Sequence, residues 1–163
     1  MSHFCKTVQT PVGALKLVAS DKGLAAVLWE NDDPKRVRLG ELVEDAGHPV
    51  LVRAESQLTE YFAGSRTEFD VPQDPAGTEF QKSVWGALGA IPFGETRSYA
   101  QVASAVGKPA AVRAVGAANG RNPISIITPC HRVIGADGSL TGFAGGLEAK
   151  RFLLDHEGSR QGA

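Results

Sequence analysis

The spacing of apolar residues changes partway along this chain, and that change limits the folds open to it more than any other feature. Up to residue 29, short apolar runs alternate or are continuous, which predicts strands. From residue 78 onward, apolar residues recur at helical intervals. Between these parts, residues 64–77 have the Pro, Gly and Asp content of a linker. We therefore expect two domains, residues 1–77 and 78–163.

The first domain is predicted to be a small antiparallel sheet covered by one helix. Turn residues bound three apolar runs, which we expect to be strands: 6–10, 15–19 and 24–29. Leu51, Ala54 and Leu58 share one face of a helix predicted over 50–62, and Gly64 ends it. That face can cover the sheet.

The second domain is predicted to be mainly helical, so the chain as a whole belongs to the α/β (α+β) class. Thr78 and Ser98 each precede a glutamine by three residues, a capping-box pattern that begins a helix. After a break at 107–108, Pro109 occupies a first-turn position and a helix is expected over 110–118. These last two helices form a helix-turn-helix candidate, with an ordinary helix pair as the alternative. A final helix is predicted to stop at Gly158.

Charge is distributed unevenly between the two parts. The net charge of −1 conceals a balance of −5 over residues 1–79 and +4 over residues 80–163. Residues 96–134 contain no Asp or Glu, and their cations are Arg97, Lys108, Arg113, Arg121 and Arg132. A stretch that carries only positive charges favours the binding of a polyanion. The alternative is a solvated surface on which the charges cluster by chance.

Composition excludes several classes of protein. With 42% hydrophobic and 21% charged residues, the chain is neither disordered nor fibrous. No apolar run approaches the roughly 20 residues of a membrane span, and the N-terminus lacks a signal-peptide pattern. Its 2 cysteines are too few for a disulfide framework or a four-thiolate zinc site. We expect a cytoplasmic protein with reduced thiols and no membrane partner.

The candidate nucleophile is Cys130, which lies between Pro129 and His131, with Arg132 following. An isolated cysteine in an apolar run is usually a core residue. Neighbouring His and Arg side chains instead favour the thiolate, the nucleophilic form of cysteine. In an extended backbone adjacent side chains point to opposite faces, so a water could carry the proton between Cys130 and His131. Several carboxylates remain eligible to orient the imidazole.

The sequence around Cys130 resembles the O6-alkylguanine-DNA alkyltransferase family, also called methylated-DNA–protein-cysteine methyltransferases, in its single-function bacterial form. The resemblance covers residues 78–163 through a set of short motifs: Phe80-Gln-x-x-Val-Trp85, Ile91-Pro-x-Gly-Glu95, Ser98-Tyr99, Arg113-Ala-Val-Gly116, Asn122-Pro123, Pro129-Cys-His-Arg-Val133, Gly145-Gly146 and Leu153-Leu-x-His-Glu157. Residues 1–77 resemble the family's ribonuclease-H-like domain more loosely.

The resemblance implies direct-reversal DNA repair in a single turnover. Cys130 would accept the alkyl group from O6-alkylguanine in double-stranded DNA, and activity on O4-alkylthymine is left open. His131 matches the family's base, which acts through a water, and Glu157 matches the carboxylate that orients the histidine. Asn122 matches the asparagine that supports the cysteine, and Tyr99 matches the tyrosine that pushes on the 3′ phosphate of the target nucleotide.

The resemblance also implies how DNA is bound. The target base must leave the stack to reach a buried thiol, and Arg113 matches the arginine finger that fills its place. A helix-turn-helix alone predicts major-groove docking, whereas the family docks in the minor groove. Small residues and one cation are expected to contact DNA beside Tyr99 and Arg113: Ala110, Ala111, Ala114, Gly116, Ala117 and Arg121. The alkylated base would be bound by Tyr99, Ser125, Val133, Phe143 and Ala144.

Some positions depart from the family's pattern. Phe143 replaces a common tyrosine, Ala144 a serine of some relatives, and Ser125 a proline of some mammalian members. Cys5 has no second cysteine near it, so we expect no metal and no cofactor. The protein is expected to be a monomer, with cooperative binding along DNA left open. Two alternatives remain: a non-catalytic binder of alkylated DNA, and a thiol hydrolase or redox enzyme.

Overall fold

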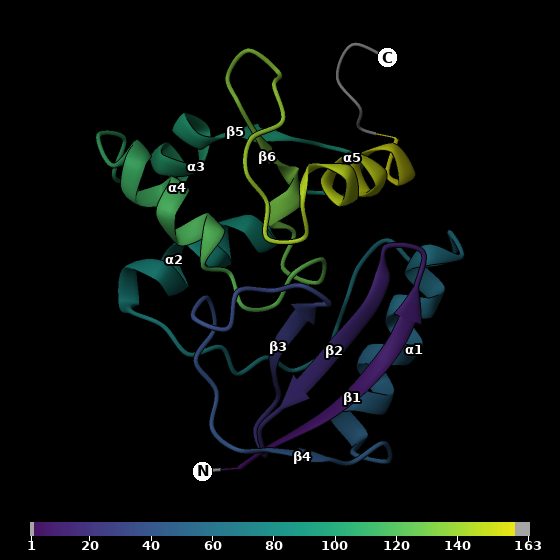
Figure 1. The fold of residues 1–163 in the computed structure, drawn as a ribbon. Helices are drawn as coiled ribbons and strands as arrows, with labels where there is room; N and C mark the ends of the chain where they lie inside the picture. The colour runs from purple at the N-terminus through teal and green to yellow at the C-terminus, as the bar shows by residue number, and fades with distance from the viewer. Residues whose placement is uncertain (1, 159–163) are drawn as a thin grey trace. The chain divides into compact units, whose positions relative to one another are not determined.

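The computed structural model describes residues 2–158, and the chain forms two compact units, residues 1–76 and 77–163. The first unit contains four strands and one helix in the order β1 (His3–Thr10), β2 (Gly13–Ala19), β3 (Leu24–Trp29), β4 (Leu42–Glu44) and α1 (Pro49–Phe62). Strand order in the sheet is β3-β2-β1-β4, and α1 lies along one face (Figure 1). The three predicted strands and the predicted helix are confirmed.

The sheet differs from the expected antiparallel meander at one edge. β1 pairs with β2 and β2 with β3 in antiparallel register, but β4 runs parallel to β1 with His3 opposite Leu42. Three residues are too short to show a hydrophobic period, which is why the sequence did not predict this strand.

Two apolar layers stabilise this unit, one on each side of the sheet. Leu15 and Leu17 alternate along β2 and are fully buried, as is Leu51 of α1. On the other face Cys5 and Val18 belong to a smaller buried cluster, against which the chain between β3 and β4 packs. Cys5 is therefore a core residue on this face of the sheet.

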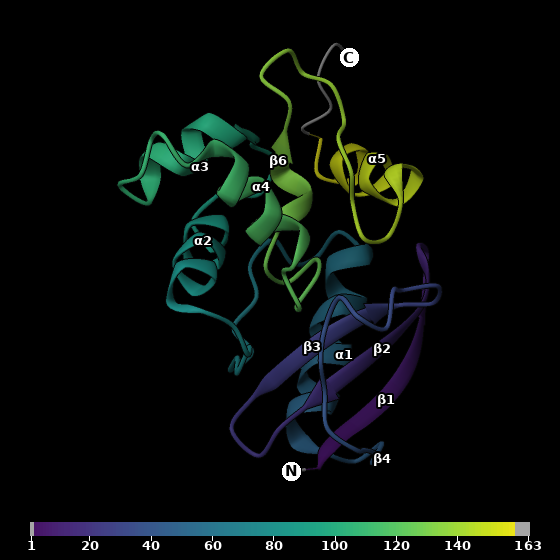
Figure 2. The same ribbon diagram turned by 60° about the vertical axis from the view of Figure 1, so that its left-hand side comes forward.

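The described part of the second unit, residues 77–158, contains four helices, one short 3-10 helix and a two-stranded parallel sheet. Its helices can be followed in Figure 2. Its elements follow in the order α2 (Glu79–Gly89), β5 (Arg97–Ser98), α3 (Tyr99–Ala105), α4 (Val112–Gly120), η1 (Cys130–Arg132), β6 (Val133–Ile134) and α5 (Leu147–His156). Both predicted capping boxes are present, at Thr78 with Gln81 and at Ser98 with Gln101. The pairing of β5 with β6 was not predicted.

α2, α3 and α4 pack around a core that includes Cys130 and Val133. Trp85 of α2 reaches across to α4, where its indole Nε1 donates a 2.8 Å hydrogen bond to the carbonyl oxygen of Ala118. This bond fixes the inner face of α4. Within residues 2–158, no helix combines the length and the hydropathy that a membrane crossing requires.

The start of α4 corrects one prediction. The helix begins at Val112 and not at Pro109 or Ala110. The amide of Ala111 donates a 2.9 Å hydrogen bond to the carbonyl of Lys108, which closes a turn over residues 108–111. Proline is as well suited to such a turn as to a helix start, so the sequence did not distinguish the two.

Candidate active site

The backbone at Cys130 forms a tight turn, which corrects the expectation of an extended segment. Residues Cys130–Arg132 are a 3-10 helix, and the amide of Arg132 donates a 3.0 Å hydrogen bond to the carbonyl of Pro129. Successive side chains in such a turn differ in direction by about 120°. The side chain of Cys130 is 4% exposed and belongs to the core of the second unit.

Asn122 organises the segment that leads to this turn. Its Nδ2 donates a 2.9 Å bond to the carbonyl of Thr128, and its Oδ1 accepts a 3.1 Å bond from the amide of Ile124. Between these contacts Ile126 has a φ of 72°, a left-handed conformation that is unfavourable for a β-branched side chain. The amide clamp therefore holds a strained loop whose end carries Cys130.

A buried imidazole, carboxylate and guanidinium form one network next to the cysteine. Nε2 of His131 lies 2.8 Å from Oε2 of Glu157. Arg132 donates to both oxygens of Glu157, from Nε at 2.8 Å and from Nη2 at 3.0 Å. Its Nη1 donates a 2.6 Å bond to the carbonyl of Ile91, and its guanidinium lies 5.9 Å from the ring centre of Phe93.

Glu157 reaches this network from the end of α5. It follows the last helical residue, His156, and its amide donates a 3.0 Å hydrogen bond to the carbonyl of Leu153. Gly94, with a φ of 84°, packs closely here, since a Cβ atom at that position would lie 3.4 Å from the carbonyl oxygen of Glu157. The backbone of Glu157 is thus held from two directions.

The electrostatics of this network keep His131 neutral. Burial lowers the pKa of His131 below 6.5, and this effect exceeds the opposing influence of the Glu157 hydrogen bond. Because Glu157 is charged and accepts from Nε2, the proton of the neutral ring belongs on Nε2. The other ring nitrogen, Nδ1, then carries a basic lone pair. This buried atom has no hydrogen-bond partner among residues 2–158.

Tyr99 and Lys150 connect the loop before α5 to the turn at Cys130. The hydroxyl of Tyr99 is hydrogen-bonded to Oγ1 of Thr141. Nζ of Lys150 donates to the carbonyl of Thr141 at 3.3 Å and to the carbonyl of Val133 at 2.7 Å. The Val133 carbonyl keeps a second lone pair for another donor.

The other residues expected to bind the base differ in their exposure. Ser125 is fully buried in the loop that Asn122 clamps. Phe143 is half-buried and packs against the core cluster that contains Cys130, and Ala144 beside it is also half-buried. The structure therefore places Phe143 and Tyr99 at the same core as the cysteine.

The residues expected to contact DNA divide between two faces of α4. Arg113, Ala114 and Ala117 are exposed, while Val115 and Ala118 point into the core. Apart from Val112 at its first position, the exposed part of α4 therefore carries small side chains and one long cation. The remaining predicted contacts lie at other places on this surface: Ala110 is exposed in the turn before the helix, Ala111 is half-buried, Gly116 is half-buried beside the ring of Tyr99, and Arg121 is exposed at the C-terminal end.

The stretch without acidic residues contributes less surface charge than its composition suggests. Arg132 is buried against Glu157, and Arg97 pairs with Glu95 at 3.0 Å. The exposed cations of 96–134 that lie outside these pairs are Lys108, Arg113 and Arg121. No group of three or more His, Cys, Asp or Glu side chains gathers in the described part of the chain as a metal site would require.

Arg132, Thr141 and Lys150 were not among the predicted site residues. The position of Arg132 beside His131 is a signal that could have identified it. Thr141 lies in an irregular loop, and Lys150 lies on an amphipathic helix where a lysine usually faces solvent. No sequence pattern distinguishes these two from ordinary surface residues.

Two domain families match the chain in sequence. Residues 3–75 match the ribonuclease-like domain of 6-O-methylguanine DNA methyltransferase, and residues 79–159 match its DNA-binding domain. Similar proteins include a methylated-DNA–protein-cysteine methyltransferase from Methanosarcina acetivorans, which is 50% identical over 151 residues, or 93% of this chain and 96% of its own. The Mycobacterium bovis protein of the same name is 49% identical over 162 residues, or 98% of this chain and 94% of its own.

A similar fold is found among solved structures. The crystal structure of Mycobacterium tuberculosis OGT in complex with DNA superposes with a TM-score of 0.87 and 48% identity. The superposition covers 96% of this chain and 94% of that one. Both units thus have counterparts in the fold of that protein.

Proposed function

Because this chain belongs to the 6-O-methylguanine DNA methyltransferase family, we propose that it repairs alkylated double-stranded DNA by moving the alkyl group from O6 of guanine onto Cys130. The observation that carries this proposal is a buried cysteine in the same tight turn as a His131–Glu157 pair. A thiol with an adjacent base and a group that orients the base is the arrangement that nucleophilic catalysis needs.

The reaction is a displacement at the alkyl carbon. A sulfur–carbon bond forms from Cys130 as the bond between that carbon and O6 breaks, and the electron pair leaves with the guanine. Guanine takes up one proton, which balances the proton that the thiol loses. The resulting thioether is stable, so each protein molecule acts once and needs no cofactor.

His131 is well arranged to accept the proton of the thiol. Its neutral ring presents the lone pair of Nδ1, while Glu157 holds Nε2 and so sets the tautomer. A water between Nδ1 and the sulfur would complete the path. Asn122 supports the same step indirectly, since its amide holds the loop that ends at Cys130.

Access to Cys130 requires that the damaged nucleotide leave the duplex, because the sulfur is buried within the second unit. The exposed face of α4 suits docking in the minor groove, since Ala114 and Ala117 allow close approach. Arg113 would then occupy the space that the base leaves. We assign further DNA contacts to the neighbouring small residues and one cation: Ala110, Ala111, Gly116 and Arg121.

The extruded base would be bound between the loop before α5 and the Asn122 loop. Tyr99 and Phe143 supply ring surfaces beside the core that holds Cys130. Ser125, Val133 and Ala144 would form the remaining wall, with backbone groups recognising the guanine edge. Without a hydroxyl, Phe143 can offer only packing.

We also propose that the protein acts as a monomer in the cytoplasm. The acceptor thiol has to remain reduced until it meets a lesion, and neither Cys5 nor Cys130 forms a disulfide. A reducing compartment supplies that condition.

Mass spectrometry tests the proposed reaction. After mixing with DNA that contains O6-methylguanine, the peptide that carries Cys130 should gain one methyl group, and the peptide that carries Cys5 should not. The Cys130→Ser variant should bind the same DNA without gaining mass. Binding by the unchanged protein with no methyl on Cys130 would identify a non-catalytic binder, and repeated turnover would identify a different enzyme.

A further inference from the structure

Lys150 of α5 is a buried cation that the proposed reaction does not use. Its side chain is fully buried, and Nζ donates only to the carbonyls of Val133 and Thr141 among the described residues. Carbonyl dipoles compensate a buried ammonium poorly, and an unpaired buried charge is costly. A methionine would fill similar space without that cost, so the charge itself requires an explanation.

The other charges around the turn already compensate one another. Glu157 is paired with Arg132 through two hydrogen bonds. His131 is neutral, because burial lowers its pKa, and Tyr99 reaches this region as a hydroxyl bonded to Thr141. Among the described residues of the site, Lys150 is left as a positive charge without an anion.

Cys130 can supply the missing anion. Burial lowers the pKa of Lys150 to about 8, and the negative charge of an ionised Cys130 acts in the opposite direction. The two residues are also joined through the backbone: Lys150 holds the Val133 carbonyl, and the Val133 amide bonds to the carbonyl of Cys130. An attraction between two charges favours both ionised forms, so the ammonium must stabilise the thiolate.

We propose that Lys150 is the counter-ion of the Cys130 thiolate and keeps the nucleophile ionised before DNA binds. Lys150 is then a positioning residue, since it acts through Cys130 and not on the alkyl group. This role deepens the proposed function, on which it rests in taking Cys130 as the nucleophile. In the resting protein the thiol proton passes by way of His131 to solvent, which leaves the imidazole neutral, and Lys150 compensates the charge that remains on sulfur.

Thiol titration without DNA tests the proposal. The rate of iodoacetamide addition at Cys130 is measured against pH, and mass spectrometry separates its peptide from that of Cys5. Lys150→Met should raise the thiol pKa by one unit or more, so that about tenfold less thiolate is present at pH values below both midpoints. Lys150→Arg, which keeps the charge, should restore most of the thiolate.

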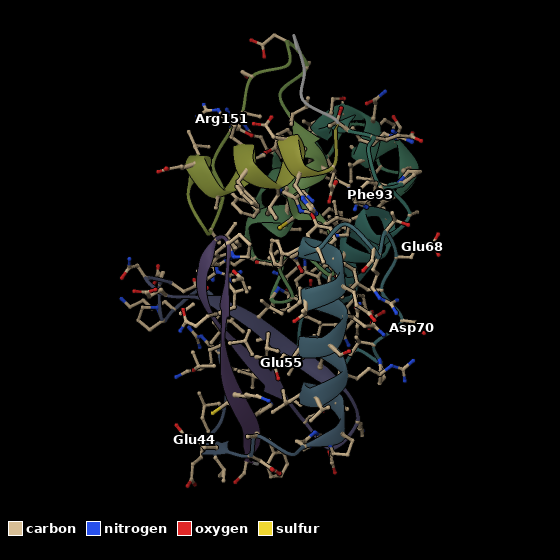
Figure 3. All side chains as sticks on the ribbon, turned by 90° about the vertical axis from the view of Figure 1, so that its right-hand side faces the viewer. Glu44, Glu55, Glu68, Asp70, Phe93 and Arg151 are labelled. Carbon is tan, nitrogen blue, oxygen red and sulfur yellow. The ribbon has the colours of Figure 1, made fainter. Side chains whose placement is uncertain are left out.

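Arg151 provides the matched control for this titration. It is the next residue of α5, and its side chain is exposed (Figure 3). Arg151→Met removes a cation from the same helix and should leave the thiol pKa unchanged. Because His131 also lies near Lys150, the titration is repeated in a His131→Gln background, where the effect of Lys150→Met should persist.

A thiol pKa that is the same in Lys150→Met as in the unchanged protein would overturn the proposal, even if the variant were less stable. If Lys150→Met does not fold, the reverse measurement decides. The pKa of Lys150, followed by NMR on protein with ¹⁵N-labelled lysine, should fall in Cys130→Ser because the anion is gone. An unchanged lysine pKa there would equally contradict the proposal.

The two proposals can fail separately. Iodoacetamide titration requires neither DNA nor alkyl transfer, so it reports on the ion pair alone. A protein that shows the coupled pKa values but gains no methyl from damaged DNA would refute the repair function and not the role of Lys150.

Discussion

At the scale of single residues, the site depends on how a few buried charges are paired. Glu157 is shared by His131 and Arg132, so one carboxylate sets the imidazole tautomer and neutralises the guanidinium. Removing one member of a buried ion pair leaves the other member without compensation. The carboxylate therefore contributes to stability and to the proposed reactivity through the same atoms.

The Glu157→Gln substitution tests whether this buried ion pair contributes more to stability than an ordinary surface pair does. We expect the free energy of unfolding to fall by about 3 kcal/mol, because Arg132 remains buried without a counter-charge. Glu95→Gln, which breaks the exposed pair with Arg97, should cost less than about 1 kcal/mol. Urea unfolding of both variants measures the difference, and equal costs would contradict the pairing described here.

The buried His131 makes stability depend on pH. Its pKa in the folded protein lies below 6.5, so the unfolded chain binds this proton first as the pH falls. Stability should therefore be complete above about pH 7 and decrease as the pH falls through 6.5. Unfolding of the unchanged protein and of His131→Gln between pH 7.5 and 5.5 provides the test, with a flatter profile expected for the variant.

At the scale of elements, α4 combines a packed inner face with an outer face that we propose binds DNA. Trp85 and Val115 hold the inner face, and the outer face presents Arg113 among small side chains. Such a helix can tolerate changes on its outer face without losing its packing. Substitution of Arg113 should therefore change function and leave the fold intact.

Arg113→Ala should slow repair of duplex DNA far more than reaction with free O6-benzylguanine. The free base does not have to leave a duplex, so its reaction creates no gap in the base stack for Arg113 to fill. Arg113→Lys, which keeps the charge but is shorter, separates charge from shape. Single-turnover rates on both substrates give the answer, and equal losses on the two would rule out the finger role.

The sequence predicted the main elements because their patterns are long or chemically specific. The capping boxes at Thr78 and Ser98 and the strand Leu24–Trp29 are where they were expected. β4, β5 and β6 were missed because elements of two or three residues have no measurable period. The turn at Cys130 was mistaken for extended backbone, since its hydrogen bonds depend on the clamp that Asn122 makes.

At the scale of the whole molecule, the two halves carry opposite net charge. Residues 1–79 have a balance of −5 and residues 80–163 one of +4. The total of −1 therefore gives no indication of the field around the second unit. Lys108, Arg113 and Arg121 are exposed cations in the part of that unit that has no acidic residues.

The affinity for undamaged duplex DNA should fall with added salt. Three phosphate contacts predict a slope of about −3 in a plot of log affinity against log salt concentration. Arg121→Gln should make the slope shallower by about one, and Lys22→Gln in the first unit should not change it. Fluorescence anisotropy across a salt series measures these slopes, and a salt-independent affinity would be inconsistent with the proposed contacts.

Glu157 lies one residue beyond the last turn of α5, and this position has a consequence for shortened forms of the protein. Helix ends unwind easily, yet here the backbone bond from the amide of Glu157 to the carbonyl of Leu153 fixes the acid that is hydrogen-bonded to the imidazole. A chain cut after residue 156 would retain the whole outer face of α4. On the proposed mechanism it would occupy lesions without correcting them, and so would shield damage from intact copies.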